Sequence, residues 1–120
     1  MSAGVHEVVA PELRGIVLDI ASGEGTLGDL VGTDVCWIGI DDSPEQLAEC
    51  DRRPVVRADM RALPFRSACA DAAVHLWCLY HLEDPVEAVA EARRVLRPGG
   101  RYFAATSARR NDPELVPEGY

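Results

Sequence analysis

The fold is decided by ten residues in the first part of the chain, Val17-Leu18-Asp19-Ile20-Ala21-Ser22-Gly23-Glu24-Gly25-Thr26. The apolar, largely β-branched run of residues 16–20 is typical of a central parallel strand that is covered on both faces. Gly23 and Gly25 allow a tight turn and a close approach of the backbone to a ligand. A helix that begins near Thr26 would direct free N–H groups and a positive dipole end at an anionic group. This stretch therefore predicts a strand, a turn and a helix that bind a nucleotide cofactor.

The composition is that of a small globular protein. A chain of 120 residues, 48% of them hydrophobic, forms one domain with a modest core. The net charge of −8 argues against a nucleic-acid backbone as partner, because binding to phosphates requires clustered Lys and Arg. Residues 1–12 show no signal-peptide pattern, and no apolar run approaches the roughly 20 residues that span a bilayer. We therefore predict a cytoplasmic protein that binds neither nucleic acid nor membrane.

The cysteines and histidines do not predict a metal site. The four cysteines are scattered without a CxxC pair, which is typical of reduced, buried thiols. His75, Cys78 and His81 have a spacing that could suggest metal ligands. Residues three apart on a strand point to opposite faces, however, and a zinc site needs four converging ligands.

Strand-like and helix-like segments alternate along the chain, which predicts an α/β fold with a doubly wound parallel sheet. The segment after residue 107 is polar, and Pro98-Gly99-Gly100 is expected to end the last helix. The predicted strands lie near residues 15–20, 35–41, 54–58, 70–77 and 100–107, and the predicted helices near 25–32, 43–51 and 84–96.

Acidic residues follow several of these strands. Right-handed crossovers place the carboxyl ends of parallel strands at one edge of the sheet, where ligands of such folds bind. We therefore expect the following residues at one edge: Asp19, Gly23 and Gly25 after the first strand, Asp41 and Asp42 after the second, Asp59 and Met60 after the third, and residues 76–81 after the fourth.

The charge of this edge bears on the choice of cofactor. Gly23-x-Gly25-x-x-Gly28 matches the dinucleotide fingerprint, but that match alone is a weak signal. Asp19, Glu24 and Asp42 would repel an anionic dinucleotide. S-adenosylmethionine carries a sulfonium and an ammonium against one carboxylate, so its net positive charge suits a cleft lined with carboxylates.

Five ordered motifs within residues 15–107 resemble those of class I S-adenosylmethionine-dependent methyltransferases, of the broad small-molecule type known as methyltransferase type 11. The resemblance implies a Rossmann-like sheet with strand order 3-2-1-4-5. The motifs are Val17-Leu18-Asp19 with Gly23-x-Gly25, Gly39-Ile40-Asp41-Asp42-Ser43-Pro44, Ala58-Asp59-Met60-Arg61-Ala62-Leu63-Pro64-Phe65, Asp71-Ala72-Ala73-Val74 with Leu79-Tyr80-His81-Leu82-Glu83-Asp84-Pro85, and Arg94-Val95-Leu96-Arg97-Pro98-Gly99-Gly100-Arg101.

The same resemblance implies a role for individual residues. The backbone of residues 21–25 would hold the methionine part of the cofactor, with Asp19 supporting the loop or the ammonium. Asp41 would accept hydrogen bonds from both ribose hydroxyls. Asp59 and Met60 would contact the amino group and the ring edge of the adenine. The candidate cofactor-binding residues are Asp19, Ala21, Gly23, Gly25, Asp41, Asp42, Asp59, Met60 and Leu76, and His81 is the candidate general base.

Several of these residues also have a purely structural interpretation. Gly23 and Gly25 could simply form a tight turn, and Asp41 could cap a helix. Asp59 could be an ordinary loop residue, and a histidine such as His81 at a strand-to-helix turn is often structural.

The chain also departs from the family pattern. Ala21 replaces the first glycine of the loop, and we expect it to fit if its φ is negative. We divide the chain into a segment of residues 1–14, a cofactor-binding core of residues 15–107 and a polar tail of residues 108–120, without the last two strands of the family sheet. The strand at 100–107 would then be an open edge, which predicts either self-association through it, as a homodimer, or a missing partner segment.

The predicted function is in-line methyl transfer to a small molecule, in which orientation supplies most of the acceleration. Two alternatives stay open. The chain could be a truncated or inactive relative that binds the cofactor without catalysis, or a module that binds a nicotinamide cofactor.

Overall fold

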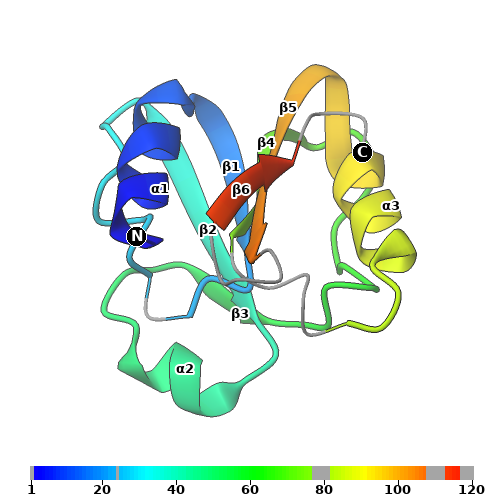
Figure 1. Ribbon diagram of the computed structural model, residues 1–120, viewed down its shortest axis with the longest axis horizontal. Helices are drawn as coiled ribbons and strands as arrows, with labels where there is room; N and C mark the ends of the chain where they lie inside the picture. The colour runs from blue at the N-terminus through cyan, green and yellow to red at the C-terminus, as the bar shows by residue number, and fades with distance from the viewer. Residues whose placement is uncertain (1, 24, 77–81, 108–112, 117–120) are drawn as a thin grey trace.

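The computed structural model describes residues 2–23, 25–76, 82–107 and 113–116. Within these residues one sheet has the strand order β3-β2-β1-β4-β5-β6, and the five strands from β3 to β5 are parallel (Figure 1). This confirms the predicted order of the parallel strands. The strands are β1 (Gly15–Ile20), β2 (Val35–Asp41), β3 (Val55–Arg57), β4 (Ala70–Leu76), β5 (Leu96–Ser107) and β6 (Pro113–Val116). The helices are α1 (Ser2–Val9), the 3-10 helix η1 (Ala10–Glu12), α2 (Pro44–Glu49) and α3 (Val86–Val95).

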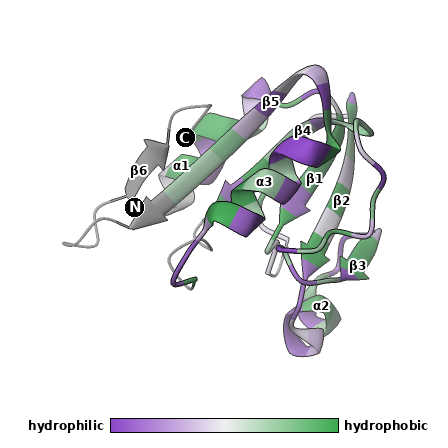
Figure 2. Cartoon of the chain, turned by 90° about the vertical axis from the view of Figure 1, so that its right-hand side faces the viewer, coloured by the Kyte–Doolittle hydropathy of each residue, from purple (hydrophilic) through white to green (hydrophobic). Residues whose placement is uncertain are grey.

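Strand β1 lies in the middle of the sheet and is covered on both faces. It pairs with β2 on one side and with β4 on the other. Leu18 and Ile20 pack with α3, whereas Val17 packs with the end of α1 and with Leu27. Figure 1 shows α1 and α3 on opposite faces of the sheet, and Figure 2 shows hydrophobic and hydrophilic residues alternating along α3. The apolar run thus forms the buried central strand that the sequence predicted.

The predicted helix at residues 25–32 is wrong. This segment forms consecutive turns, in which Asp29 N–H donates to the carbonyls of Gly25 at 3.3 Å and Thr26 at 3.2 Å. Gly25 has a φ of +86°, which does not fit a right-handed helix. Two further glycines, at positions 28 and 32, lower the helix propensity of the segment. The turns still cover the sheet, because Leu27 is buried against Val17 and Val74.

The last helix ends earlier than predicted. Helix α3 ends at Val95, because Leu96 already pairs with Ala70 as the first residue of β5. The register then shifts before Arg101 pairs with Ala72, and Gly99, with a φ of +83°, lies within this irregular part of the strand. Pro98-Gly99-Gly100 is therefore part of β5 rather than the signal that ends α3.

The structure also corrects two expectations about the end of the chain, namely the polar tail of residues 108–120 and the open edge at the last parallel strand. Strand β6 pairs antiparallel with β5, from Ala104 opposite Val116 to Ser107 opposite Pro113. The unpaired backbone groups of an edge strand readily accept another strand, and here a segment of the same chain takes that place. One of the two strands that we expected to be absent is thus present beside β5. A homodimer would have to use an edge other than residues 104–107 of β5.

Within the described residues, no helix combines the length and the apolar character that crossing a bilayer would require.

A buried polar pair links β4 and β5. The His75 Nδ1 atom lies 2.6 Å from the Tyr102 hydroxyl oxygen, and the two rings meet edge to face. His75 is fully buried, and this burial lowers the pKa of its imidazole from 6.5 to about 4.

We predict that His75 makes the protein less stable in mild acid. Between pH 6.5 and about 4 the unfolded chain binds a proton at this residue and the folded protein does not, so the stability falls as the pH falls through this range. The contribution is about 3 kcal/mol over the full range. Denaturant unfolding of His75→Gln between pH 4 and 7 is expected to lack this part of the slope. The control His6→Gln, in α1, is expected to keep it, and an unchanged slope in His75→Gln would contradict the prediction.

Candidate functional site

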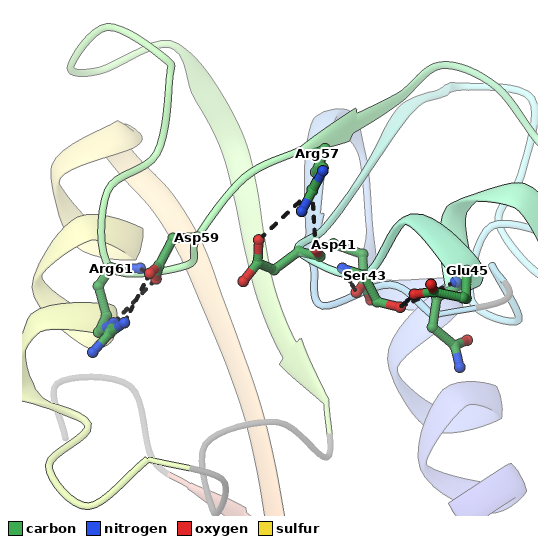
Figure 3. Close-up of polar contacts among 8 residues, drawn as sticks. Asp41, Ser43, Glu45, Arg57, Asp59 and Arg61 are labelled. Carbon is green, nitrogen blue, oxygen red and sulfur yellow. Dashed lines mark hydrogen bonds and ion pairs between the residues drawn. The ribbon is translucent and has the colours of Figure 1, made fainter.

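Three of the predicted acidic residues lie at the same edge of the sheet. Ile20 at the end of β1 pairs with Ile40, one residue before Asp41, and Asp41 in turn pairs with Arg57 at the end of β3. Figure 3 shows Asp41 close to Arg57, with Asp59 apart from both of them, beside Arg61. The negative charge of Asp41 acts on the carboxyl of Asp19, the residue before the last one of β1. The structure therefore brings Asp19 and Asp41 together. Asp59 follows the neighbouring strand β3, where its contacts are with Arg61.

Asp41 joins the loop after β1 to the start of α2. Its Oδ2 atom accepts a hydrogen bond from Gly23 N–H, and its Oδ1 atom accepts one from Ser43 N–H, both at 2.9 Å. The helix cap is Ser43 itself, whose hydroxyl accepts from Gln46 N–H. Asp41 is half-buried, and a carboxylate has about four lone pairs, so each oxygen can accept one more hydrogen bond.

The loop of residues 21–25 bends through left-handed backbone conformations. Ala21 has a φ of +62°, so the condition under which we expected alanine to fit, a negative φ, is not met. Gly23 and Gly25 have φ values of +57° and +86°, which explains why glycine is suited to both positions. The tight turn from β1 forces positive φ at alternate residues, and Ala21 adopts it although its Cβ makes that conformation unfavourable.

Three amide groups of this loop donate hydrogen bonds within the protein. Ser22 N–H donates to Ile40 O at 2.9 Å, and Gly25 N–H donates to Ser22 O at 3.0 Å, while Gly23 N–H donates to Asp41. These three amides therefore shape the loop rather than offering free donors to a ligand. The Ser22 hydroxyl oxygen is buried and has no hydrogen-bond partner among the described residues.

Asp19 lies beneath this loop. It is 3% exposed, and its Oδ2 atom accepts a hydrogen bond of 2.9 Å from the indole N–H of Trp37. Burial raises the pKa of the Asp19 carboxyl from 3.8 to about 7, the bond from Trp37 opposes this rise, and the charge of Asp41 adds to it. Asp19 therefore changes between its neutral and its charged form near neutral pH.

The sequence analysis did not identify Trp37 as a site residue. It is 3% exposed on β2, and its ring lies where side chains at Gly28 and Gly39 would stand, at 2.8 and 2.5 Å from their ideal Cβ positions. The signal that could have found it is a tryptophan on a strand, two residues before a glycine and close to a loop that is also rich in glycine.

Two of the predicted carboxylates have arginine partners. The Arg61 side chain binds Asp59 through two N–H groups, at 2.8 and 3.1 Å, and its backbone N–H donates to Asp59 at 2.8 Å. These contacts hold the pKa of Asp59 at about 2. Asp42 is exposed, with a carboxylate oxygen 4.0 Å from Arg57 Nε. The negative charge of this edge is therefore smaller than the sequence suggested.

The remaining candidates are apolar or lie outside the described residues. Met60 is half-buried against the core on the α3 face, and Leu76, 6% exposed, ends β4 on the opposite face. His81, the candidate general base, lies outside the described residues, as do Glu24 and Trp77.

Comparison with known proteins shows the family. Residues 18–104 match a family that is described as methyltransferase domain. The matched segment begins in β1 and ends in β5, so it contains all of the edge described above. The chain belongs to this family of S-adenosylmethionine-dependent methyltransferases.

The relatives include enzymes with different names. The chain is similar to the ubiquinone/menaquinone biosynthesis C-methyltransferase of Acidiphilium cryptum, with 34% identity over 91% of this chain and 52% of the relative. Its fold is similar to that of the YcgJ protein of Bacillus subtilis, with 25% identity and a TM-score of 0.76 over 88% of this chain and 50% of that one. It is also similar to the [4+2]-cyclase SpnF, with 26% identity and a TM-score of 0.75 over 87% of this chain and 43% of that one. The chain thus spans about half of the length of these relatives.

S-adenosylmethionine is the cofactor of this family, and the polar groups of the edge fit it. Asp41 is a fixed acceptor with a free lone pair on each oxygen, which suits two neighbouring hydroxyls. Asp59 stays ionised and keeps one free lone pair on Oδ2, which suits an amino group. The amides of Ser22, Gly23 and Gly25 donate within the protein, so they are not free donors for the methionine part of the cofactor, which the resemblance places at the backbone of residues 21–25.

We predict that Ala21→Gly stabilises the protein by about 0.5–1 kcal/mol, since glycine adopts a positive φ without the steric cost that alanine has. The matched control is Ala68→Gly, because Ala68 has a φ of +57° in an exposed loop between β3 and β4. Denaturant unfolding is expected to give a similar gain for both variants. A loss of stability in Ala21→Gly would show that packing of the Ala21 methyl group stabilises the protein by more than the positive φ of alanine destabilises it.

Proposed function

We propose that this domain binds S-adenosylmethionine at the carboxyl edge of β1 to β4 and transfers its methyl group to a small molecule. The observation that carries the proposal is Asp41. In a chain that belongs to the methyltransferase family, this half-buried carboxylate is fixed by two backbone amides at the end of β2. Such a rigid acceptor is suited to two ribose hydroxyls.

The other residues of the edge have roles that follow from their positions. Asp59, oriented by Arg61, would accept a hydrogen bond from the adenine amino group, and Met60 would contact the ring edge. Leu76, at the end of β4, would form part of the apolar wall near the reacting groups. Asp42, exposed and near Arg57, has the weakest claim to a contact with the cofactor.

The chemistry requires little from the protein besides orientation. When bound, the cofactor supplies a methyl group on a sulfonium, which is a good leaving group. The residues of the edge would hold the ribose and the adenine in place, and this orientation accounts for most of the acceleration. His81 is proposed as the general base only for an acceptor that must lose a proton before it attacks.

A small molecule is the favoured acceptor for two reasons. The net charge of −8 disfavours a nucleic-acid backbone, and the relative from Acidiphilium cryptum has a name that refers to quinone biosynthesis. The acceptor is proposed by class only, as a small molecule, because the chain spans about half of the length of that relative.

A second function is favoured by one of the comparisons. The similar fold of a protein described as a [4+2]-cyclase indicates that this architecture also serves reactions other than methyl transfer. A domain that binds the cofactor without using its methyl group is therefore the alternative. The family match through β1 to β5 gives no support to a nicotinamide cofactor.

We predict that Asp41→Ala weakens S-adenosylmethionine binding about tenfold or more, since a charged acceptor for two hydroxyls contributes about 1.5–3 kcal/mol. Isothermal titration calorimetry measures the change. The matched control Asp51→Ala removes the same charge from an exposed position after α2 and is expected to bind like the unmodified protein. Equal affinities for the three proteins would rule out Asp41 as the ribose acceptor.

Turnover distinguishes the two functions. Incubation with S-adenosylmethionine and a panel of quinols, phenols, amines and thiols is expected to release S-adenosylhomocysteine with at least one acceptor. The Asp41→Ala variant is expected to lose most of that release at cofactor concentrations below its dissociation constant. Tight binding without release for any acceptor would favour the alternative of a binding domain.

A further inference from the structure

We propose that Trp37 is a positioning residue of the cofactor site, which holds the Asp19 carboxyl by a hydrogen bond and supports the turns of residues 21–28 with its ring. The inference rests on the proposed function, because it concerns the same site. Trp37 itself is 3% exposed and is not proposed to touch the cofactor.

The first support is the isolation of the Asp19 carboxyl. It is almost fully buried, and among the described residues the Trp37 indole is the group that donates to it, at 2.9 Å. Within the same residues no arginine or histidine forms an ion pair with it. A buried carboxyl depends strongly on such a donor, because an unsatisfied polar group is costly in a buried position.

The second support is the packing of the loop on the indole ring. Ideal Cβ atoms at Gly28 and Gly39 would lie 2.8 and 2.5 Å from ring atoms, and one at Gly25 would lie 3.7 Å away. The ring thus fills the space that side chains at Gly28 and Gly39 would need, and it lies in van der Waals contact with the position at Gly25. Arg52 covers the ring, with its guanidinium carbon 5.9 Å from the ring centre. The ring therefore joins the turns of residues 25–28 to β2, in addition to the hydrogen bonds of Ser22 with Ile40 and of Gly23 with Asp41.

The two contacts have a joint consequence for cofactor binding. Trp37 fixes the position of the loop and, through its N–H group, favours the charged form of Asp19. A cationic ligand at this edge also favours the charged form, since opposite charges attract. Cofactor affinity is therefore expected to rise with pH while Asp19 loses its proton, and removal of the indole N–H is expected to move this rise to higher pH.

The surroundings of Asp19 and Trp37 contain few other charged or titratable groups. The Asp41 carboxylate acts on Asp19 from the end of β2, and it favours the neutral form. Cys50, which follows α2, packs against Gly25, and the Arg52 guanidinium lies over the ring. Burial raises the pKa of the Asp19 carboxyl to about 7.

The test compares three variants with the unmodified protein. Trp37→Phe keeps an aromatic ring and loses the N–H donor, and Asp19→Asn keeps an acceptor and loses the titration. Tyr102→Phe is the matched control, because it removes a buried polar group from the other face of the sheet, where it contacts His75. Calorimetry between pH 5.5 and 8.5 gives the dissociation constant of S-adenosylmethionine for each protein. The ammonium of the cofactor itself loses its proton near pH 8, which affects all four proteins alike.

The expected result is a shift of the pH profile in one variant. Trp37→Phe is expected to bind about tenfold more weakly at pH 7 and to recover part of this loss at higher pH. Asp19→Asn is expected to show no rise of affinity near pH 7, and Tyr102→Phe is expected to keep the original profile. Binding by Trp37→Phe with the unshifted profile would overturn the inference and leave the proposed function intact. No binding by the unmodified protein at any pH would overturn both.

A second measurement needs no cofactor. The raised pKa of Asp19 means that the folded protein keeps a proton which the unfolded chain releases, so the stability falls as the pH rises from about 4 to about 7. This slope of stability against pH is opposite in sign to the one that His75 causes. The change in the slope between a variant and the unmodified protein therefore reports on the residue that the substitution affects. In denaturant unfolding, the stability of Trp37→Phe is expected to continue to fall up to a higher pH than that of the unmodified protein. For Tyr102→Phe, the fall is expected to end at the same pH as in the unmodified protein. A fall that ends at the same pH in Trp37→Phe would contradict control of Asp19 by the indole.

Discussion

The burial of β1 on both faces is the constraint on which the rest of this structure depends. A strand with hydrogen-bonded neighbours on both sides and apolar cover above and below has no exposed backbone except at its ends. The chain must leave it through a tight turn, and this turn lies next to the ends of the other parallel strands. Loops that follow parallel strands then share one edge, and the polar residues of those loops meet there.

The polar residues at this edge are positioned mainly by each other. Asp41 binds the amides of Gly23 and Ser43, Trp37 binds Asp19, and Arg61 binds Asp59. Each carboxylate is thus oriented before any ligand arrives, which reduces the cost of binding. The same contacts reduce the electrostatic attraction for a cation, because Arg57 and Arg61 lie beside Asp42 and Asp59 and the raised pKa of Asp19 keeps it partly neutral. Recognition at this edge therefore depends on oriented hydrogen bonds more than on net charge.

The outer parts of the sheet are less strongly specified than its centre. Strand β3 has three residues, and β6 pairs with β5 over four. At the centre, β1 and β4 carry side chains that are buried on both faces, so their register has few alternatives. This difference explains why the sequence predicted the central strands well and the residues after Ser107 poorly.

The sequence by itself determined the central strands, the order of the motifs and the acidic residues near the end of β1 and at the end of β2, because apolar runs and turn residues are local signals. The tertiary structure alone decided the conformation of Ala21, the turns in place of a helix after Gly25, the arginine partners of Asp42 and Asp59, and the place of Trp37 beneath the loop. The partner of Asp42 and the place of Trp37 depend on which residues meet across neighbouring strands and loops. Trp37 and Asp19 are far apart in the sequence and come into contact only because β1 and β2 pair side by side.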